Sequence, residues 1–304
     1  MSSNDRPTSE QQPEQSWTLG QLLTWTTQFL RKHGSDSPQL DAQLLLAHAR
    51  KCTRIELFTA YGEEASEAVR REFRELVKRR ADGVPVSYLV GHREFYSLDF
   101  RVTPDVLVPR PETEFLVIAA TDLAKEKAGQ HLPWVIADVG TGSGVLAICL
   151  ARELSQSAVW ATDISPAALE LARENCVSHG VADRVTLLRG DLLAPVPDDL
   201  RFDLIVSNPP YVTTAEYAQL PRSIRDHEPR QALVAGEKGT ELIERLIPQA
   251  AQKLKPGGWL LVEISPMIEQ DVYALLSSDG RFAAPSTVRD LAGQARVVQA
   301  AIQR

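Results

Sequence analysis

The spacing of hydrophobic and polar positions changes along the chain. The first part of the chain has the spacing that is typical of helices. Over residues 17–80 apolar residues recur every three or four positions, as at Phe73 and Val77, which predicts amphipathic helices. Thr18 and Thr53 are each followed three residues later by Gln or Glu, the capping-box pattern that marks a helix start. We therefore expect a small N-terminal helical bundle over this stretch.

A segment of strand character follows the helical part. Phe95, Leu98, Phe100 and Val102 are spaced two or three positions apart, with polar residues between the last three, which predicts a half-exposed strand containing an irregularity. The apolar run 106–108 ends at a proline and predicts a second strand. The sequence therefore predicts a β-hairpin linker over 81–110.

Beyond residue 110, helical patterns alternate regularly with short apolar runs. This alternation predicts parallel strands joined by right-handed helical crossovers, in a sheet covered on both faces. Two β-prone runs around a Gly-containing turn predict an antiparallel edge near the C-terminus. The expected strands are 134–139, 158–162, 185–188, 204–206, 259–264, 286–288 and 296–302. We expect an α/β domain over 111–304, Rossmann-like, with a mostly parallel sheet and an antiparallel C-terminal edge strand.

Composition narrows the class of protein. The chain has 304 residues, of which 43% are hydrophobic and 24% charged, a balance that excludes collagen, coiled coils and disordered chains. The net charge of −7 does not favour a polyanionic partner or an anionic membrane. Cys52, Cys149 and Cys176 are too far apart for paired metal-ligand spacing. We expect a cytoplasmic protein without membrane association or metal, with a disordered tail at 1–16.

The strongest local signal is the sequence DVGTGSG, which begins at Asp138, follows an apolar run and precedes a helical pattern. Glycines in a strand-to-helix turn permit positive φ and let the backbone approach a ligand closely. Val145 stands where a dinucleotide fingerprint needs its third glycine, and the lysine of a phosphate-binding P-loop is missing. The candidate cofactor-binding residues of this loop are Gly140, Thr141, Gly142, Ser143 and Gly144.

Two further carboxylates follow the next two expected strands. Asp163 lies about 20 residues beyond the glycine loop, where a carboxylate can accept hydrogen bonds from the two hydroxyls of a ribose. Asp191 has the equivalent position after the strand 185–188. Together with Asp138, these residues are expected to line one crevice at the carboxyl edge of the sheet. The position of an acid at the end of each of these strands favours a site for a nucleoside-containing ligand over a glycine turn with a purely structural role.

The sequence Asn208-Pro209-Pro210-Tyr211 follows another expected strand. Two consecutive prolines fix φ and remove two N–H donors, so the carbonyls beside them are rigid acceptors. A planar N–H₂ group can donate to the Asn208 side-chain oxygen and the Pro209 carbonyl while its π face packs on Tyr211. The motif therefore predicts a binding site for a planar nitrogen, and its place at the crevice disfavours an unliganded rigid turn.

Together, the glycine loop, the acid and the Asn-Pro-Pro-Tyr motif resemble class I S-adenosylmethionine-dependent methyltransferases that act on planar nitrogen. A closer resemblance, to the bacterial release factor glutamine methyltransferases, spans nearly the whole chain. The RPETE stretch and the helical N-terminal part are more specific than Asn-Pro-Pro-Tyr, which adenine methyltransferases share. The similar segments are SPQLDAQLLLAHA from Ser37, YLVGHREFYSLDF from Tyr88, LVPRPETE from Leu107, SNPPY from Ser207, HEPRQALVAG from His227 and RDLAGQARVV from Arg289.

This resemblance implies an enzyme that methylates the side-chain amide N5 of the glutamine in the Gly-Gly-Gln loop of class 1 peptide-chain release factors, with no direct need for nucleic acid. It implies that the glycine loop borders the methionine part of S-adenosylmethionine, Asp163 the ribose and Asp191-Leu192 the adenine, with residues 110–114 near the active site. The helical part is expected to help dock the release factor. Residues that depart from those common in the family are Leu192, Lys238 and Ser265. The implied substrate-binding residues are Asn208, Pro209, Pro210 and Tyr211, of which Asn208, Pro209 and Tyr211 are the implied catalytic residues; Asn208 also borders the cofactor.

The sequence alone leaves other functions open. A glutamine in ribosomal protein L3 would need the same chemistry, and an exocyclic amine of a nucleic acid would need a similar acceptor site. A non-catalytic sensor of S-adenosylmethionine is disfavoured by the intact Asn208 motif. No strong general base is required before methyl transfer, so His92 and His227 are only candidate acceptors of the proton released later.

Overall fold

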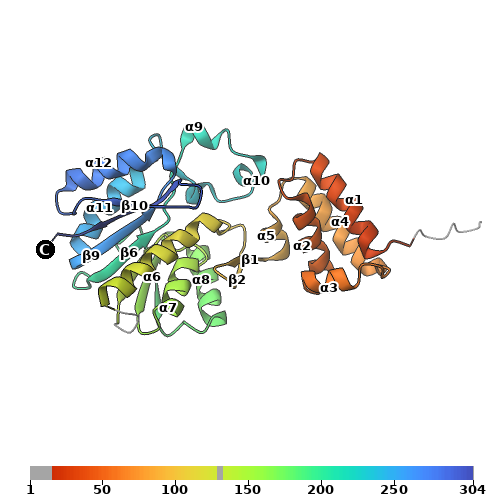
Figure 1. Cartoon of the computed structure of the whole chain (residues 1–304), viewed down its shortest axis with the longest axis horizontal. Coiled ribbons are helices and arrows are strands. Elements are labelled where there is room, and N and C mark those ends of the chain that lie inside the picture. Colours follow the sequence, from red (N-terminus) through yellow and green to blue (C-terminus); the bar gives the residue numbers. More distant parts are fainter. Residues whose placement is uncertain (1–15, 129–132, 304) are drawn as a thin grey trace, which may run out of the picture. The chain divides into compact units, whose positions relative to one another are not determined.

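The computed structural model describes residues 16–128 and 133–303 and divides the chain into two units (Figure 1). The first unit ends at Val90 and the second begins at Gly91. This division lies inside the segment 81–110 that was predicted to link two domains. The predicted tail at 1–16 lies outside the described residues except for Ser16.

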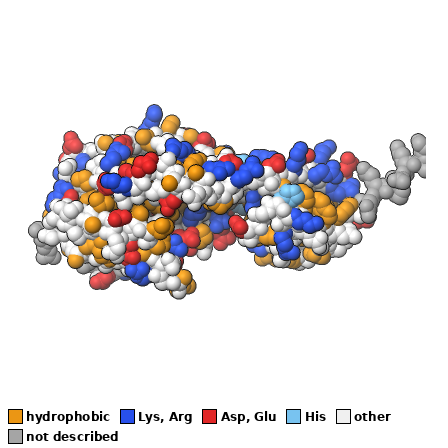
Figure 2. All heavy atoms as spheres, turned by 90° about the horizontal axis from the view of Figure 1, so that it is seen from above, with side chains coloured by type: hydrophobic (Ala, Val, Ile, Leu, Met, Phe, Trp, Pro, Cys, Tyr) orange, Lys and Arg blue, Asp and Glu red, His pale blue; other side chains and the backbone are white. Residues whose placement is uncertain are grey.

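The first unit is a bundle of helices around its own apolar core (Figure 1). Thr18 and Thr53 form the predicted capping boxes, each accepting a hydrogen bond from the backbone N–H three residues on. The helix α4 carries six Lys or Arg residues and three Glu residues, and Figure 2 shows Lys and Arg side chains on the surface of this unit. The helices are α1 (Leu19–Lys32), α2 (Pro38–Arg50), α3 (Arg54–Thr59), α4 (Glu67–Ala81) and α5 (Val86–Val90).

The second unit begins with a tight β-hairpin, β1 (His92–Phe95) and β2 (Leu98–Arg101). The predicted single strand with an irregularity is wrong here, because Tyr96 and Ser97 adopt positive φ values of 51° and 59° and turn the chain back on itself. The run 106–108 was predicted as the partner strand and has no strand structure. It runs instead along the cavity described below.

The main sheet has seven strands in the order β10-β11-β9-β6-β3-β4-β5. From β9 to β5 all neighbours are parallel, whereas β11 is antiparallel to both β9 and β10. The predicted Rossmann-like α/β fold with an antiparallel C-terminal edge is therefore confirmed. The strands are β3 (Val135–Val139), β4 (Ala158–Asp163), β5 (Val185–Arg189), β6 (Phe202–Ser207), β9 (Leu254–Glu263), β10 (Ser286–Arg289) and β11 (Ala295–Ala301).

Helices cover both faces of this sheet (Figure 1). One apolar core includes residues of α6 (Glu114–Ala128), α7 (Val145–Glu153) and α8 (Pro166–Ser178). The core on the opposite face includes residues of α11 (Glu241–Lys253) and α12 (Glu269–Asp279). Within the described ranges, none of the helices combines the length and the hydropathy needed to cross a membrane.

A small parallel pair of strands, which the sequence did not predict, follows the Asn-Pro-Pro-Tyr motif. The strands β7 (Val212–Thr213) and β8 (Val234–Gly236) pair with Val212 opposite Val234. Between them lie the short helices α9 (Thr214–Tyr217) and α10 (Arg222–Arg225) and the 3₁₀ turn Arg230–Ala232. This pairing brings the chain that follows the motif next to the segment around residue 234.

Candidate functional site

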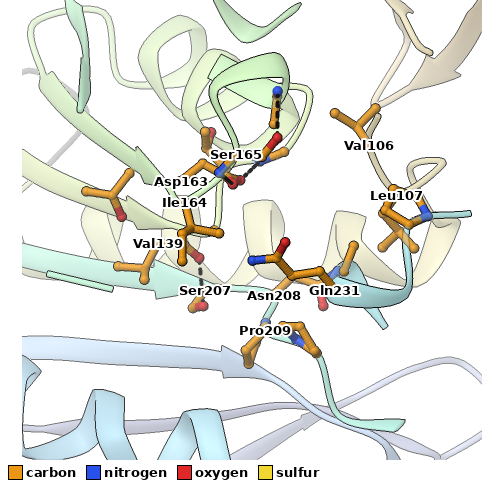
Figure 3. A pocket seen from close by; sticks show the side chains of 18 of the residues that line it. Val106, Leu107, Val139, Asp163, Ile164, Ser165, Ser207, Asn208, Pro209 and Gln231 are labelled. Atoms are coloured by element: carbon orange, nitrogen blue, oxygen red, sulfur yellow. Dashed lines mark hydrogen bonds between the residues drawn. The ribbon is translucent and has the colours of Figure 1, made fainter. Parts of the chain in front are cut away.

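A cavity of about 420 Å³ opens at the carboxyl ends of the parallel strands (Figure 3). Val139 at the end of β3, Asp163 at the end of β4 and Ser207 at the end of β6 all line it. The strand order reverses here, since β4 lies on one side of β3 and β6 on the other. Ligands of open α/β sheets bind at such a switch point, and the volume lies in the usual range for small-molecule sites.

The glycine loop forms one wall, and its glycines are required for different reasons. Gly140 and Gly142 have φ values of 76° and 54°, and an added Cβ would meet no described atom within 4 Å. Gly144 has a φ of 85°, and its Cβ would lie 3.2 Å from the Ala172 Cβ. The first two glycines therefore expose backbone to the cavity, whereas the third permits close helix packing. Gly140, Thr141, Gly142 and Ser143 line the cavity, and Gly144 lies behind them.

Asp138 supports this loop from within the protein. Its Oδ2 accepts hydrogen bonds from the Thr141 hydroxyl at 2.6 Å and the Ala147 N–H at 3.1 Å. The side chain is fully buried, and burial raises the pKa of Asp138 to about 7. Asp138 does not line the cavity. The expectation that it lines the crevice with the other two acids is therefore wrong, because its carboxyl group turns back toward the start of α7.

Asp163 lies on the cavity wall beside the glycine loop (Figure 3). Its Oδ2 accepts the Gly142 N–H at 2.9 Å, and its Oδ1 accepts the Ser165 N–H at 2.9 Å. A carboxylate oxygen can accept more than one hydrogen bond, so both oxygens retain capacity for hydroxyl donors. The two backbone contacts fix the orientation of the carboxylate, which suits a pair of neighbouring hydroxyls such as those of a ribose.

The wall beyond Asp163 combines a charge with apolar side chains. Asp191 lines the cavity but forms an ion pair with Arg245 from α11, which also lines it. Leu192, which has a φ of 51°, and Ile164, which is 49% exposed, present aliphatic surface to the same cavity. Sequence reasoning missed Ile164 and Arg245. The signal for Ile164 was a large apolar residue directly after the strand-end acid.

Asn208 extends into the cavity from the end of β6, beside Pro209 (Figure 3). Its Nδ2 donates a hydrogen bond to the Thr113 Oγ1 at 2.9 Å. This bond leaves the Asn208 Oδ1 as an acceptor for a group in the cavity. Pro209 and Pro210 line the same wall. The structure thus brings the motif together with the glycine loop and Asp163.

Tyr211, the fourth residue of the motif, does not line this cavity. Its ring packs against the apolar core on the α11 side of the sheet. Burial, together with the nearby Glu263 carboxyl, raises the pKa of Tyr211 to about 12, so the phenol keeps its proton at neutral pH. The Tyr211 ring therefore supports the motif from the core side, whereas Asn208 lies at the cavity wall.

The remaining wall comes from two segments distant in sequence. Residues 105–107 and 109–110 line the cavity on one strip, and Pro229, Gln231 and Ala232 line it on the other. Arg110 joins the two strips through an ion pair with the buried Glu228. His92 and His227 do not line the cavity. Neither histidine is therefore positioned here to receive a proton directly from a group bound in it.

Two family models match the chain. Residues 21–91 match the PrmC N-terminal domain, and residues 119–224 match the methyltransferase small domain. The second match contains the glycine loop, Asp163 and Asn208.

Curated relatives match over nearly the whole chain. The release factor glutamine methyltransferase of Rhodopirellula baltica is 47% identical over 97% of this chain and 97% of the relative. The enzymes of the same name from Moorella thermoacetica and Koribacter versatilis are 43% and 40% identical, each over 92% of this chain and over 96% and 97% of their own lengths.

Solved structures agree on the fold. A methyltransferase from Pyrococcus furiosus aligns with a TM-score of 0.50 and 19% identity, covering 69% of this chain and 90% of that one. The 16S rRNA N2 G1207 methyltransferase of T. thermophilus, in complex with AdoMet and guanosine, aligns with a TM-score of 0.51 and 20% identity, covering 70% and 50%. At these identities the likeness concerns the fold alone.

Proposed function

The chain belongs to the release factor glutamine methyltransferase family, and from this we propose that it transfers a methyl group from S-adenosylmethionine to the N5 of the glutamine in the Gly-Gly-Gln loop of class 1 peptide-chain release factors. The observation that carries the proposal is the Asn208 side chain, whose amide nitrogen is engaged by Thr113 while its oxygen is left to accept from a substrate N–H.

The cavity fits the proposed cofactor in volume and in chemistry. Gly140 and Gly142 leave open space beside the backbone, which suits the methionine part of the molecule. Asp163 has acceptor capacity for ribose hydroxyls, and Leu192 and Ile164 offer apolar surface for an adenine ring. When bound, S-adenosylmethionine supplies an electrophilic methyl group on a sulfonium.

The protein's task toward the glutamine is mainly one of orientation. An amide nitrogen is a poor nucleophile because its lone pair is delocalised into the carbonyl group. In the proposed complex the Asn208 Oδ1 and the Pro209 carbonyl accept the two N–H bonds and fix the nitrogen in the cavity. The same acceptors stabilise the positive charge that develops on nitrogen as the new bond forms. We propose that Tyr211 contributes by supporting this turn from the core side.

The first unit is proposed to take part in recognising the release factor. A folded protein substrate offers more surface than a pocket for one side chain can read, and this unit exposes both apolar and basic side chains. Ile55 and Phe58 are 77% and 53% exposed, and Trp25 and Tyr61 are exposed as well. Replacing Ile55 and Phe58 by Ser should raise the KM for the intact release factor and leave the KM for a Gly-Gly-Gln peptide unchanged. An unchanged KM for both substrates would contradict this role.

One experiment separates the proposed substrate from its rivals. The protein is incubated with methyl-tritiated S-adenosylmethionine and, in parallel, a class 1 release factor, the same factor with its Gly-Gly-Gln glutamine replaced by alanine, ribosomal protein L3, and a DNA or RNA oligonucleotide. Label only in the unaltered release factor supports the proposal. Label in ribosomal protein L3 or in the oligonucleotide would assign a different substrate. Since release factors act in translation, we place the reaction in the cytoplasm.

A further inference from the structure

A buried carboxyl group, that of Glu263, lies behind Asn208 with the Thr113 side chain between them. Thr113, whose hydroxyl accepts the Asn208 amide, is itself 3% exposed. The Thr113 side chain also lies within hydrogen-bonding reach of Glu263, and this contact lowers the Glu263 pKa; Glu263 is 2% exposed at the end of β9. The Glu263 Oε2 has no hydrogen-bond partner within residues 16–128 and 133–303. Glu263 is thus a buried acid with an unpartnered oxygen, and Thr113 is the one residue between it and Asn208. The fold alone does not explain such a group.

Counting protons shows what this arrangement imposes on the Asn208 amide. A hydroxyl has one proton to donate, and an ionised carboxylate can only accept. When Glu263 is ionised, the Thr113 proton points to it, and the Thr113 oxygen can only accept from Asn208. The amide must then turn its N–H₂ toward Thr113 and its oxygen Oδ1 toward the cavity. The opposite orientation would place two donors against the N–H bonds of a substrate amide.

We propose that Glu263 is a positioning residue for methyl transfer, which holds the Asn208 side-chain oxygen toward the substrate nitrogen through the Thr113 hydroxyl. The inference rests on the proposed function, because it concerns the same site. It adds a residue on β9 whose side chain does not line the cavity. The single carboxylate thereby sets the direction of two successive hydrogen bonds.

The groups around Glu263 determine the pKa of its carboxyl group. Burial is the main influence and raises the pKa of Glu263 to about 7, with a contribution in the same direction from Glu112. The Thr113 hydrogen bond and the guanidinium groups of Arg296 and Arg110 act in the opposite direction. The Tyr211 phenol lies near enough to interact electrostatically with this carboxyl and keeps its proton. Glu263 therefore changes charge near neutral pH.

Protonation of Glu263 removes the constraint. A neutral carboxylic acid can donate to the Thr113 oxygen, which frees the Thr113 proton to bond the Asn208 Oδ1 and lets the amide turn round. The rate of methyl transfer should therefore rise as pH increases through the Glu263 titration near 7. The low-pH form should still bind the cofactor, because Asp163 and the glycine loop are not part of this relay.

The activity test uses the full chain, saturating S-adenosylmethionine and a release factor in single-turnover assays from pH 5.5 to 8.5. We expect Glu263→Gln and Thr113→Val to slow the transfer step by about 10-fold to 100-fold, the size of loss known for residues that orient the ligands of a metal, with little change in cofactor Kd. Both variants should lose the pH dependence, and Thr113→Ser should restore the wild-type rate and profile. The matched control is Glu244→Gln, since Glu244 accepts from the Thr240 hydroxyl in the same unit without contacting Asn208.

The rate and pH profile of Glu263→Gln could instead match those of wild type and Glu244→Gln, and that result would overturn the proposal. A second readout does not depend on the substrate. In ¹⁵N NMR spectra, the Asn208 side-chain N–H₂ signals of the wild type should shift with the Glu263 titration and stay constant with pH in Thr113→Val. Signals that are constant in both proteins would refute the relay. A wild type that shows this shift but leaves the release factor unlabelled would contradict the proposed function alone.

Discussion

Arg110 and Glu228 form an ion pair that joins two walls of the cavity, with the Arg110 Nη2 2.6 Å from the Glu228 Oε1. The Glu228 side chain is 1% exposed, and its Oε2 also accepts the Val108 N–H at 3.3 Å. The strip that ends at Arg110 and the strip that begins at Pro229 are thereby fixed to each other. The geometry of the cavity therefore depends on a buried carboxylate that does not itself line it.

Removal of this carboxylate should destabilise the fold. Glu228→Ala leaves the Arg110 guanidinium without its partner, so we expect a loss of about 3–5 kcal/mol in the free energy of unfolding, measured by urea denaturation. The control is Glu170→Ala, since Glu170 pairs with Arg173 on the surface of α8 and should change stability by no more than about 1 kcal/mol. Equal losses in both variants would show that the Arg110–Glu228 pair has no special structural role.

Asp163 should determine cofactor affinity. Asp163→Ala removes the proposed acceptors for the ribose and also the partner of the Gly142 N–H. We expect S-adenosylmethionine to bind at least about tenfold more weakly in calorimetry, since a hydrogen bond to a charged group contributes about 1.5–3 kcal/mol. Asp203→Asn is the matched control, because Asp203 lies near the opposite end of β6 and contacts Val135 and Lys255. An unchanged dissociation constant for Asp163→Ala would refute the ribose assignment.

Two glycine substitutions can separate the effect of backbone strain from the effect of lost ligand contact in the glycine loop. Gly142→Ala places a Cβ in the left-handed region, which costs about 1–2 kcal/mol, and directs it into the open space at the cavity wall. Gly34→Ala has the same strain at a φ of 79° after α1, away from the cavity. Both variants should lose similar stability in thermal denaturation, whereas only Gly142→Ala should bind cofactor more weakly. Equal cofactor affinities would argue against backbone contact at Gly142.

Asp138 should make stability depend on pH. Its pKa is raised from 3.8 to about 7 in the folded protein, so the folded state binds this proton more tightly than the unfolded state. The stability that this group contributes is fully present below pH about 4 and is lost as pH rises through about 7. An amide side chain does not titrate, so the unfolding free energy of Asp138→Asn relative to wild type should increase between pH 5 and pH 8. Urea denaturation of the cofactor-free proteins measures it, and a pH-independent difference would contradict the raised pKa.

Much of the fold was predictable because it depends on local periodicity. The apolar runs at 158–162 and 185–188 correspond to β4 and β5, and their alternation with helices implies the parallel sheet. The hairpin was harder to predict, since its turn uses Tyr96 and Ser97 at positive φ without a Gly or Asn to mark it. The run 106–108 is apolar because it is partly buried beside the cavity, and burial alone does not distinguish a strand from an extended strip.

The site was predictable where the key residues follow strands directly. Asp163 and Asn208 lie on the cavity wall because the carboxyl ends of parallel strands meet at one edge. Contacts between distant segments could not be predicted. Thr113 and Asn208 are 95 positions apart, and no local pattern indicates that Glu263 reaches the same hydroxyl. Tyr211 shows the opposite difficulty, because proximity in sequence to Asn208 does not place its ring in the same cavity.

The most direct measurement of the central claim is the single-turnover rate of methyl transfer from S-adenosylmethionine to a release factor by Asn208→Ala, compared with wild type, at cofactor and substrate concentrations that saturate both proteins. The account predicts a loss of at least about 100-fold, the scale expected when a polar group that stabilises the transition state is removed, with a nearly unchanged cofactor Kd. A variant that methylates the Gly-Gly-Gln glutamine at the wild-type rate would contradict it.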